Sequence, residues 1–172
     1  TSGNGLFDLR TLDEARAEYR FPFDTPPHDR AYFEAHMEAL ANYYRQMSDG
    51  ALDIQYEVYP RESGSSYQLG TTLKDYGNGR TRTEIAERIT RLFRDGIAAA
   101  DSAEGENLDF GRFDYFAVFH AGLGAEAGQQ ALNDIPSAFV DRADLETHAG
   151  GPVPVDGGTH AVSSGMLLPE AI

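Results

Sequence analysis

Large side chains recur at steps of three and four residues in the part of the chain that follows Pro26-Pro27. The stripe that they form consists of Tyr32, Phe33, His36, Met37, Leu40, Tyr44 and Met47. Because such steps bring side chains to one face of a helix, the spacing predicts an amphipathic helix. The two prolines and Asp29 favour a helix start, and Gly50 favours its end, since glycine tolerates a left-handed backbone.

A regular alternation follows this helix and predicts a strand with one buried face. The apolar positions are Leu52, Ile54, Tyr56 and Val58, and the polar positions between them are Asp53, Gln55 and Glu57. A second helix is predicted over residues 82–100, where the three- and four-residue spacing returns and the outer face is charged. Its apolar stripe consists of Ile85, Ile89, Leu92, Phe93 and Ile97.

The run from Phe113 to Phe119 is apolar enough to predict a strand inside a sheet. Shorter apolar pieces at residues 135–140 and 165–169 carry a proline at or near one end, and we interpret them as edge strands. Residues 61–81 and 141–160 are rich in Gly, Ser, Thr, Pro and charged residues, a composition that predicts surface loops.

Composition supports a folded chain, because 41% hydrophobic and 11% aromatic residues are too many for a disordered one. With 172 residues the chain is long enough for one domain with its own core and short for two. Helix, acidic connection and buried strand together predict the α/β (α+β) class. We therefore expect a single domain over residues 1–172.

Charge and cysteine content narrow the range of partners and chemistries. The chain has 28 acidic and 14 basic residues, and its net charge of -14 repels phosphate backbones and anionic lipids. We therefore expect neither a nucleic acid nor a membrane partner, while divalent cations stay open as ligands. The absence of cysteine excludes disulfides, thiolate-bound zinc and a cysteine nucleophile. No apolar run approaches the roughly 20 residues of a membrane-spanning helix, and no signal peptide is visible, although one removed before Thr1 would leave no trace.

A histidine, two glycines and a carboxylate follow the apolar run in the order His120, Gly122, Gly124, Glu126. The glycines would let backbone amides approach a ligand or another segment closely, which makes the group a candidate site. For His120 a packed structural role and a functional role both stay open. Glu126 is interpreted as a salt-bridge partner, a cation ligand or a solvated turn residue.

An acidic segment joins the second predicted helix to the apolar run. Its carboxylates are Asp101, Glu104, Glu106 and Asp109, and they offer the hard oxygen ligands that calcium prefers. The segment lacks the Asp-x-Asp-x-Asp-Gly order of an EF-hand loop, so calcium binding is a weak expectation here. The five histidines include no His-Glu-x-x-His, and no Gly-x-Ser-x-Gly, phosphate-binding or dinucleotide-binding pattern occurs.

Nine short segments occur in an order that carries a family resemblance. The early ones are Phe21-Pro22-Phe23-Asp24, Tyr43-Tyr44, Ser48-Asp49-Gly50 and the run from Leu52 to Tyr59. The later ones are Asp109-Phe110, Phe113-Asp114, the run from His120 to Glu126, Asp134-Ile135-Pro136-Ser137 and Met166-Leu167-Leu168-Pro169-Glu170. Together they resemble the amino-terminal part of the catalytic domain of secreted bacterial zinc metallopeptidases of the immune inhibitor A-like family. The resemblance runs from about Phe21 to the last residue.

The resemblance implies a zincin-like amino-terminal subdomain, in which a mixed, twisted sheet carries two main helices and lines the substrate cleft. It also implies an extracellular location and, as partners, a peptide or protein substrate and the remainder of the catalytic domain. His120, Gly122, Gly124 and Glu126 would then lie near the cleft.

Zinc in the parent protein would be bound by a His-Glu-x-x-His helix beyond Glu170, so we expect no catalytic residue here and no activity of the chain alone. Many relatives carry an aspartate-rich, calcium-type loop after the position of Asp114, whereas this chain continues directly into Tyr115. That departure argues against calcium at this place. The alternative function is a non-catalytic binding or interaction domain of similar fold, with calcium as a candidate ligand.

Overall fold

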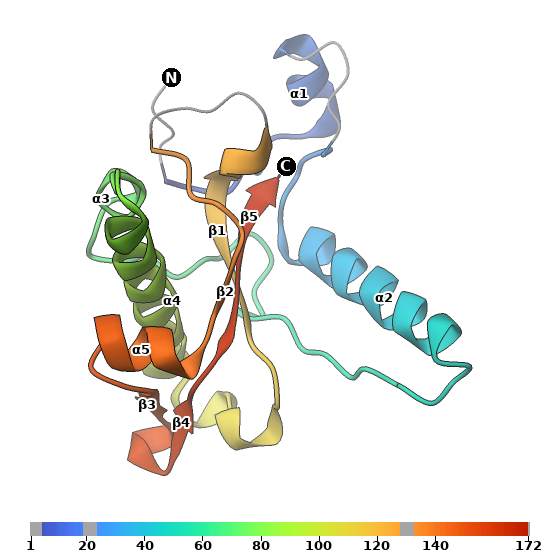
Figure 1. The fold of residues 1–172 in the computed structure, drawn as a ribbon. Coiled ribbons are helices and arrows are strands. Elements are labelled where there is room, and N and C mark those ends of the chain that lie inside the picture. The colour runs from blue at the N-terminus through green and yellow to red at the C-terminus, as the bar shows by residue number, and fades with distance from the viewer. Residues whose placement is uncertain (1–4, 19–23, 128–132, 172) are drawn as a thin grey trace. The chain divides into compact units, whose positions relative to one another are not determined.

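The computed structural model describes residues 5–18, 24–127 and 133–171. The chain divides into two compact units, one formed by residues 7–66 and the other by residues 1–6 and 67–172. Helices and a small mixed sheet together give the α/β character that the sequence predicts (Figure 1). Among the described residues no helix is long and apolar enough to span a membrane. Whether the two units behave as a single domain stays a prediction.

The unit of residues 7–66 contains two helices, α1 (Leu12–Glu18) and α2 (Arg30–Met47). The start of α2 agrees with the prediction, since the Asp29 carboxylate accepts a hydrogen bond from the Tyr32 amide at 3.2 Å. Its end agrees as well, because Gly50 has a φ of +80° and donates its amide to the Arg45 carbonyl at 2.8 Å.

The apolar stripe of α2 is covered less than its spacing predicts. The buried residues of α2 are Phe33, from the stripe, and Ala41, from outside it, whereas Tyr44 and Met47 keep 42% and 68% of their surfaces exposed. The carboxyl-terminal half of the helix therefore does not pack as a core helix within the described chain. The Tyr43 ring meets the Tyr44 ring edge-on instead, with centroids 5.4 Å apart.

The strand predicted for residues 52–58 is wrong in the structure, which has no strand there. The alternation itself is visible, since Ile54, Tyr56 and Val58 are partly buried and the polar residues between them are exposed. A strand also needs a neighbour for its backbone groups, and this segment is linked to α2 by side chains. An Arg45–Asp53 ion pair at 2.5 Å makes one such link.

The second unit is built on α4 (Arg82–Glu104), the long helix of the prediction for residues 82–100. Thr81 and Glu84 form a reciprocal capping box at its start, which satisfies amides that would otherwise lack partners. The helix continues four residues further than predicted and ends at Gly105, whose φ is +52°. The first part of the acidic segment is thus helical.

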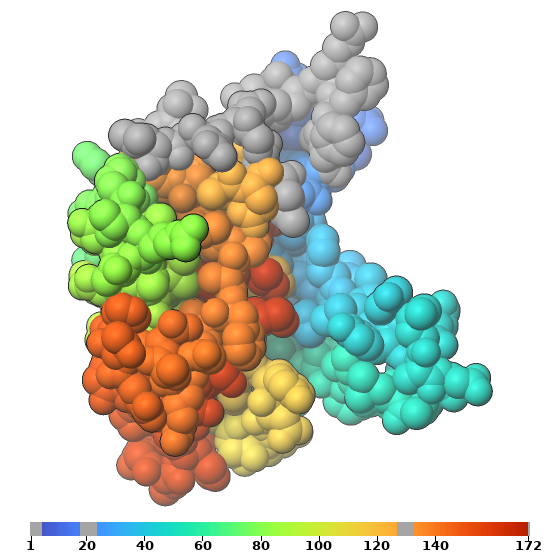
Figure 2. All heavy atoms as spheres, in the orientation of Figure 1, coloured from blue at the N-terminus to red at the C-terminus, as the bar shows by residue number. Residues whose placement is uncertain are grey.

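Two short helices occur in segments predicted as loops. They are α3 (Leu73–Gly77) and α5 (Arg142–His148), each started by a side-chain cap, from Thr72 and from Asp141 respectively. Their composition resembles loops because cap residues and turn residues are of the same types. α5 packs against α4, and Figure 2 shows the green and orange residues of these helices adjoining on one face.

The main sheet contains β1 (Ala117–Leu123), β5 (Gly165–Ala171) and β2 (Ala138–Val140) in the order β1-β5-β2. β1 runs parallel to β5, and β2 runs antiparallel to it. The edge position predicted for residues 135–140 is confirmed, while the edge position predicted for residues 165–169 is wrong, because β5 is the central strand.

Pro169 is compatible with a central strand because of where β2 stops. β2 pairs with β5 only between Gly165 and Leu167. Pro169, which has no amide hydrogen to donate, lies beyond the end of this pairing, so no hydrogen bond to β2 is lost. β1 begins four residues later than predicted, at Ala117, and lies at an edge of the sheet and not inside it as predicted. A separate hairpin is formed by β3 (Val153–Val155) and β4 (His160–Val162).

The core of this unit lies between α4 and the sheet. Tyr76, Leu92, Ile135 and Leu167 form a buried cluster, with Leu69, Leu73, Ile89 and Val118 packed around it. Gly165 marks the closest approach, because a Cβ there would lie 2.6 Å from the Phe93 ring. One predicted helix therefore packs on the sheet, and packing of α2 on it stays a prediction.

Candidate functional site

A hollow of about 460 Å³ lies where the end of α4, the Phe110–Arg112 turn and the β3–β4 hairpin meet. The residues around it are Asp101, Gly105, Glu106, Leu108, Asp109, Asp156, Gly157, Thr159 and His160. Four of them are carboxylates, one is a histidine, and none of these lining residues is Lys or Arg. The lining of the hollow is therefore strongly acidic.

Three side chains in this hollow converge on one point. Asp109, Asp156 and His160 each offer one ligand atom, and these atoms lie within 4.8 Å of one another. The His160 Nδ1 is 3.0 Å from the Asp156 Oδ2, so the imidazole and that carboxylate already contact each other. Oxygen and imidazole nitrogen ligands in this arrangement are suited to a divalent cation.

Backbone contacts hold the two aspartates in place. Asp156 accepts the Phe110 amide at 3.3 Å, and its own amide donates to the Asp101 carboxylate at 2.8 Å. Asp109 accepts the Gly111 amide at 3.0 Å. The Asp101 carboxylate thus fixes the backbone at Asp156.

The His160 ring packs closely against Gly111, which has no side chain. A Cβ on Gly111 would lie 2.6 Å from both the Cε1 and the Nε2 of the His160 ring, so the ring lies directly against the Gly111 backbone. The Thr159 hydroxyl lies 3.3 Å from the Nδ1 of the same ring. The imidazole is therefore positioned although half of its surface is exposed.

The structure brings three of the four predicted calcium ligands to this hollow. Asp101, Glu106 and Asp109 line it, whereas Glu104 turns away and accepts a hydrogen bond from the Tyr67 hydroxyl at 2.7 Å. Sequence reasoning missed Asp156 and His160, which come from a hairpin about fifty residues later. Their spacing of four residues in Asp156-Gly-Gly-Thr-His160 was the available signal, but nothing in the sequence connects it to the acidic segment.

The other predicted group lies at the carboxyl end of β1, and Figure 1 shows that end and the β3–β4 hairpin at opposite ends of this unit. His120 lies inside the strand rather than after it and is 6% exposed. Its Nδ1 is 3.0 Å from the Ala121 carbonyl oxygen, and its buried Nε2 has no partner among the described residues. Burial lowers the pKa of His120.

Glu126 and the glycines take structural places around this histidine. Burial alone would raise the pKa of Glu126, but hydrogen bonds from Ser137 to its carboxylate hold the pKa below its usual range. Gly124 is needed for space, because a Cβ there would lie 2.9 Å from Pro169 and 3.0 Å from the Glu126 carboxylate. These contacts give Glu126 a local hydrogen-bonding role, which is not among the three interpretations drawn from the sequence.

Glu170 was not predicted and belongs to the same group. It is 7% exposed, and its carboxylate accepts the Gly122 amide at 2.8 Å. A buried carboxylate of this kind cannot be recognised from sequence, since the Pro169-Glu170 pair looks like the end of a strand. Neighbouring strands β1 and β5 bring it beside His120.

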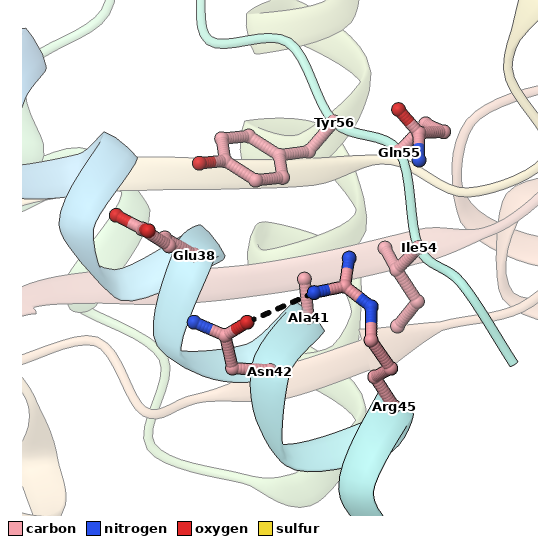
Figure 3. Close-up of a pocket in the computed structure, with 7 residues that line it drawn as sticks. All are labelled: Glu38, Ala41, Asn42, Arg45, Ile54, Gln55 and Tyr56. Atoms are coloured by element: carbon pink, nitrogen blue, oxygen red, sulfur yellow. Dashed lines mark hydrogen bonds between the residues drawn. The ribbon is translucent and has the colours of Figure 1, made fainter. Parts of the chain in front are cut away.

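A second hollow, of about 400 Å³, lies within the unit of residues 7–66, between α2 and the extended segment after it (Figure 3). Glu38, Ala41, Asn42, Arg45, Ile54, Gln55 and Tyr56 line it. Arg45 is already engaged, since it donates to the Asn42 side chain at 3.1 Å and pairs with Asp53. The residues drawn in Figure 3 do not converge on a common point, so this hollow is not a candidate site.

Comparison with known proteins finds no matching family model, no matching curated protein and no matching solved structure.

Proposed function

We propose that this chain is the sheet-bearing, amino-terminal part of a secreted zinc-dependent metallopeptidase, in which it supplies the scaffold and a wall of the substrate cleft. The proposal rests on the order of the sequence segments and on one observation in the structure. That observation is the exposed antiparallel edge strand β2, to which an extended peptide can add as a further strand.

The direction of the backbone groups supports this use of β2. Met166 donates its amide to the Phe116 carbonyl at 2.8 Å, so its backbone groups face β1. Because directions alternate along a strand, Gly165 and Leu167 face β2, where they meet Val140 and Ala138. The amide and carbonyl of Phe139 then point away from β5, and the Phe139 side chain is 64% exposed. Within the described chain no strand pairs on that side.

The described residues do not supply a catalytic zinc site of the implied family. The only convergent ligand set among them, Asp109, Asp156 and His160, has a single histidine, and the sequence contains no His-Glu-x-x-His. The proposal therefore assigns zinc to the part of the parent beyond Glu170, and this chain contributes peptide alignment.

The decisive experiment uses the gene product extended past Ile172. We expect the present 172 residues to leave casein intact with added zinc, and an extended form carrying His-Glu-x-x-His to cleave it. In that form Phe139→Pro should lower kcat/KM about tenfold, because it removes one outward amide, equivalent to about 1.4 kcal/mol, and leaves the pairing with β5 unchanged. Phe139→Ala, which keeps the amide, is the control. An extended sequence without a zinc-binding helix would refute the proposal.

A second function, cation binding by an interaction domain, is favoured by the convergence of Asp109, Asp156 and His160. Calcium takes six to eight oxygens, and Glu106 and solvent would have to complete the set, whereas manganese or zinc would also accept the imidazole. Nothing in this second function requires a catalytic part.

Titration with each ion tests the second function directly. We expect calorimetric heat and a rise in Tm with at least one of Ca²⁺, Mn²⁺ and Zn²⁺, since a ligand that binds only the folded state stabilises it. Asp156→Asn should abolish both signals, and Asp114→Asn, an exposed carboxylate that does not line the hollow, should leave them unchanged. Absence of heat with all three ions would rule out this function.

A further inference from the structure

The carboxyl end of β1 departs from regular pairing with β5. His120 lies opposite Pro169 and Leu123 lies opposite Ala171, so β1 uses one more residue than β5 over this stretch. The extra residue makes a bulge, and Gly122 within it has a φ of +96°, which favours glycine. This end of the sheet therefore needs local contacts to stay closed.

Three hydrogen bonds close the bulge. The Gly122 amide donates to the buried Glu170 carboxylate at 2.8 Å, and the Gly124 amide donates to the Ala171 carbonyl at 3.0 Å. The Ala125 amide then reaches the Ile135 carbonyl at 3.3 Å. Two of the three bonds tie β1 and the turn after it to the end of β5.

The surroundings of His120, which lies next to the bulge, favour a neutral imidazole ring. Its Nδ1 lies 3.0 Å from the Ala121 carbonyl, which assigns the hydrogen to Nδ1 and leaves a lone pair on Nε2. Nε2 is buried and has no hydrogen-bond partner among the described residues. A second proton would create a buried positive charge, and the Ile135 backbone and the carboxylates of Glu126 and Glu170 only partly offset the cost of burying it.

The charged groups around the ring only partly offset this cost. The carboxylates of Glu126, from the turn after β1, and of Glu170, from β5, both act on the ring and favour its charged form. Burial outweighs them, so the pKa of His120 lies below its ordinary value of 6.5. Neutral His120 and the closed bulge therefore belong together.

We propose that His120 is a proton-operated latch, which keeps the carboxyl ends of β1 and β5 closed while its ring is neutral and opens them when the ring takes up a proton. Opening brings the imidazole into water and breaks the Gly122–Glu170 and Gly124–Ala171 hydrogen bonds. Phe93 and Ile97 of α4 take no part in these hydrogen bonds, so we expect the core around them to stay folded. This latch is independent of either function proposed above.

Linkage gives the direction of the effect. The pKa of His120 is near its ordinary value of 6.5 in the opened state and lower in the closed state. Between these two pKa values the opened state therefore binds more protons than the closed state. Opening is then favoured by up to tenfold for each pH unit over which the pH falls within this window. Above pH 6.5 the latch contributes its full closing effect, and below the lower pKa no further opening occurs.

Amide hydrogen exchange measured between pH 7.5 and 5, and corrected for the intrinsic rate, tests the latch. Protection of the Gly122 and Gly124 amides should fall severalfold as the pH decreases, while protection of the Phe93 and Ile97 amides in α4 stays constant. In His120→Gln the glycine amides should lose this pH dependence. Equal pH dependence in both proteins would overturn the proposal.

A second measurement on the unchanged protein keeps the test valid if His120→Gln does not fold. The Hε1 resonance of His120, followed by nuclear magnetic resonance over the same range, should titrate below 6.5, together with the change in glycine protection. A titration at or above 6.5 would overturn the latch, and so would a loss of protection that also includes the α4 amides.

Discussion

Single glycines decide how closely the elements of the second unit approach one another. Gly165 lies at the start of β5, where a Cβ would be 2.6 Å from both the Phe93 ring and the Phe116 carbonyl oxygen. Gly96 is similar, since a Cβ there would lie 2.9 Å from Val118 of β1. The contact between helix and sheet therefore depends on positions without side chains, a different requirement from the apolar stripe of α4.

We expect Gly165→Ala to destabilise the protein by about 1–3 kcal/mol, because the methyl group must displace a buried ring or backbone in a filled core. The free energy of unfolding from urea denaturation measures the effect. Gly70→Ala is the matched control, since a Cβ there has no atom within 4 Å and should change the stability by less than about 0.5 kcal/mol. Equal losses in the two variants would contradict the packing argument.

At the scale of elements, α4 is defined by its first turn as much as by its apolar stripe. The Thr81 side chain accepts the Glu84 amide, and the Glu84 carboxylate accepts the Thr81 amide at 3.0 Å. The helix then carries Thr90, Leu92, Phe93 and Ile97 into the core. The start of the helix thus fixes which residues face the sheet.

Thr81→Ala removes the acceptor for the Glu84 amide, and we expect it to lower the free energy of unfolding by about 0.5–2 kcal/mol. Thr83→Ala, at an exposed position in the same first turn, should be neutral or slightly stabilising, because alanine favours the helix more than threonine does. Thermal unfolding followed by circular dichroism separates the two. A neutral Thr81→Ala would show that the cap is not needed.

The predictions that held and those that failed differ in the range of the interactions behind them. The limits of α2 follow from Asp29 and Gly50, residues within one turn of the helix ends, and periodicity over many residues identifies α4. Residues 52–58 alternate as a strand does but lack a neighbouring strand, and this absence is not encoded in the segment itself. Nearby residues therefore allowed the limits of α2 to be predicted, although not the short helices α3 and α5, and the partner of a strand could not be predicted from the strand itself.

The candidate site shows the same limit. Asp101 and Asp109 could be proposed as ligands because they share one acidic segment, yet the residue whose backbone Asp101 fixes, Asp156, lies 55 positions away. His120 was recognised as a candidate, but its burial depends on β5, which follows it by more than forty residues. The types of ligand residue could be predicted from the sequence, but which of them lie together depends on the fold.

At the scale of the whole molecule, the chain consists of two compact units with different degrees of packing. The unit of residues 67–172 contains the sheet, the buried cluster around Leu167, the acidic hollow and the latch. The unit of residues 7–66 exposes much of the apolar stripe of α2. A net charge of -14 over both units repels other acidic surfaces and favours cations, in agreement with the second function proposed for the hollow.

The strand order β1-β5-β2 also has a consequence for synthesis on the ribosome. β1 and β2 do not pair with each other, and the strand that joins them, β5, follows both in the sequence. Translation therefore delivers two outer strands that must wait, unpaired, for the central one. During that interval the helices that precede β5, α4 among them, can form, because their backbone hydrogen bonds join residues close in the sequence, while the outer strands expose unpaired edges.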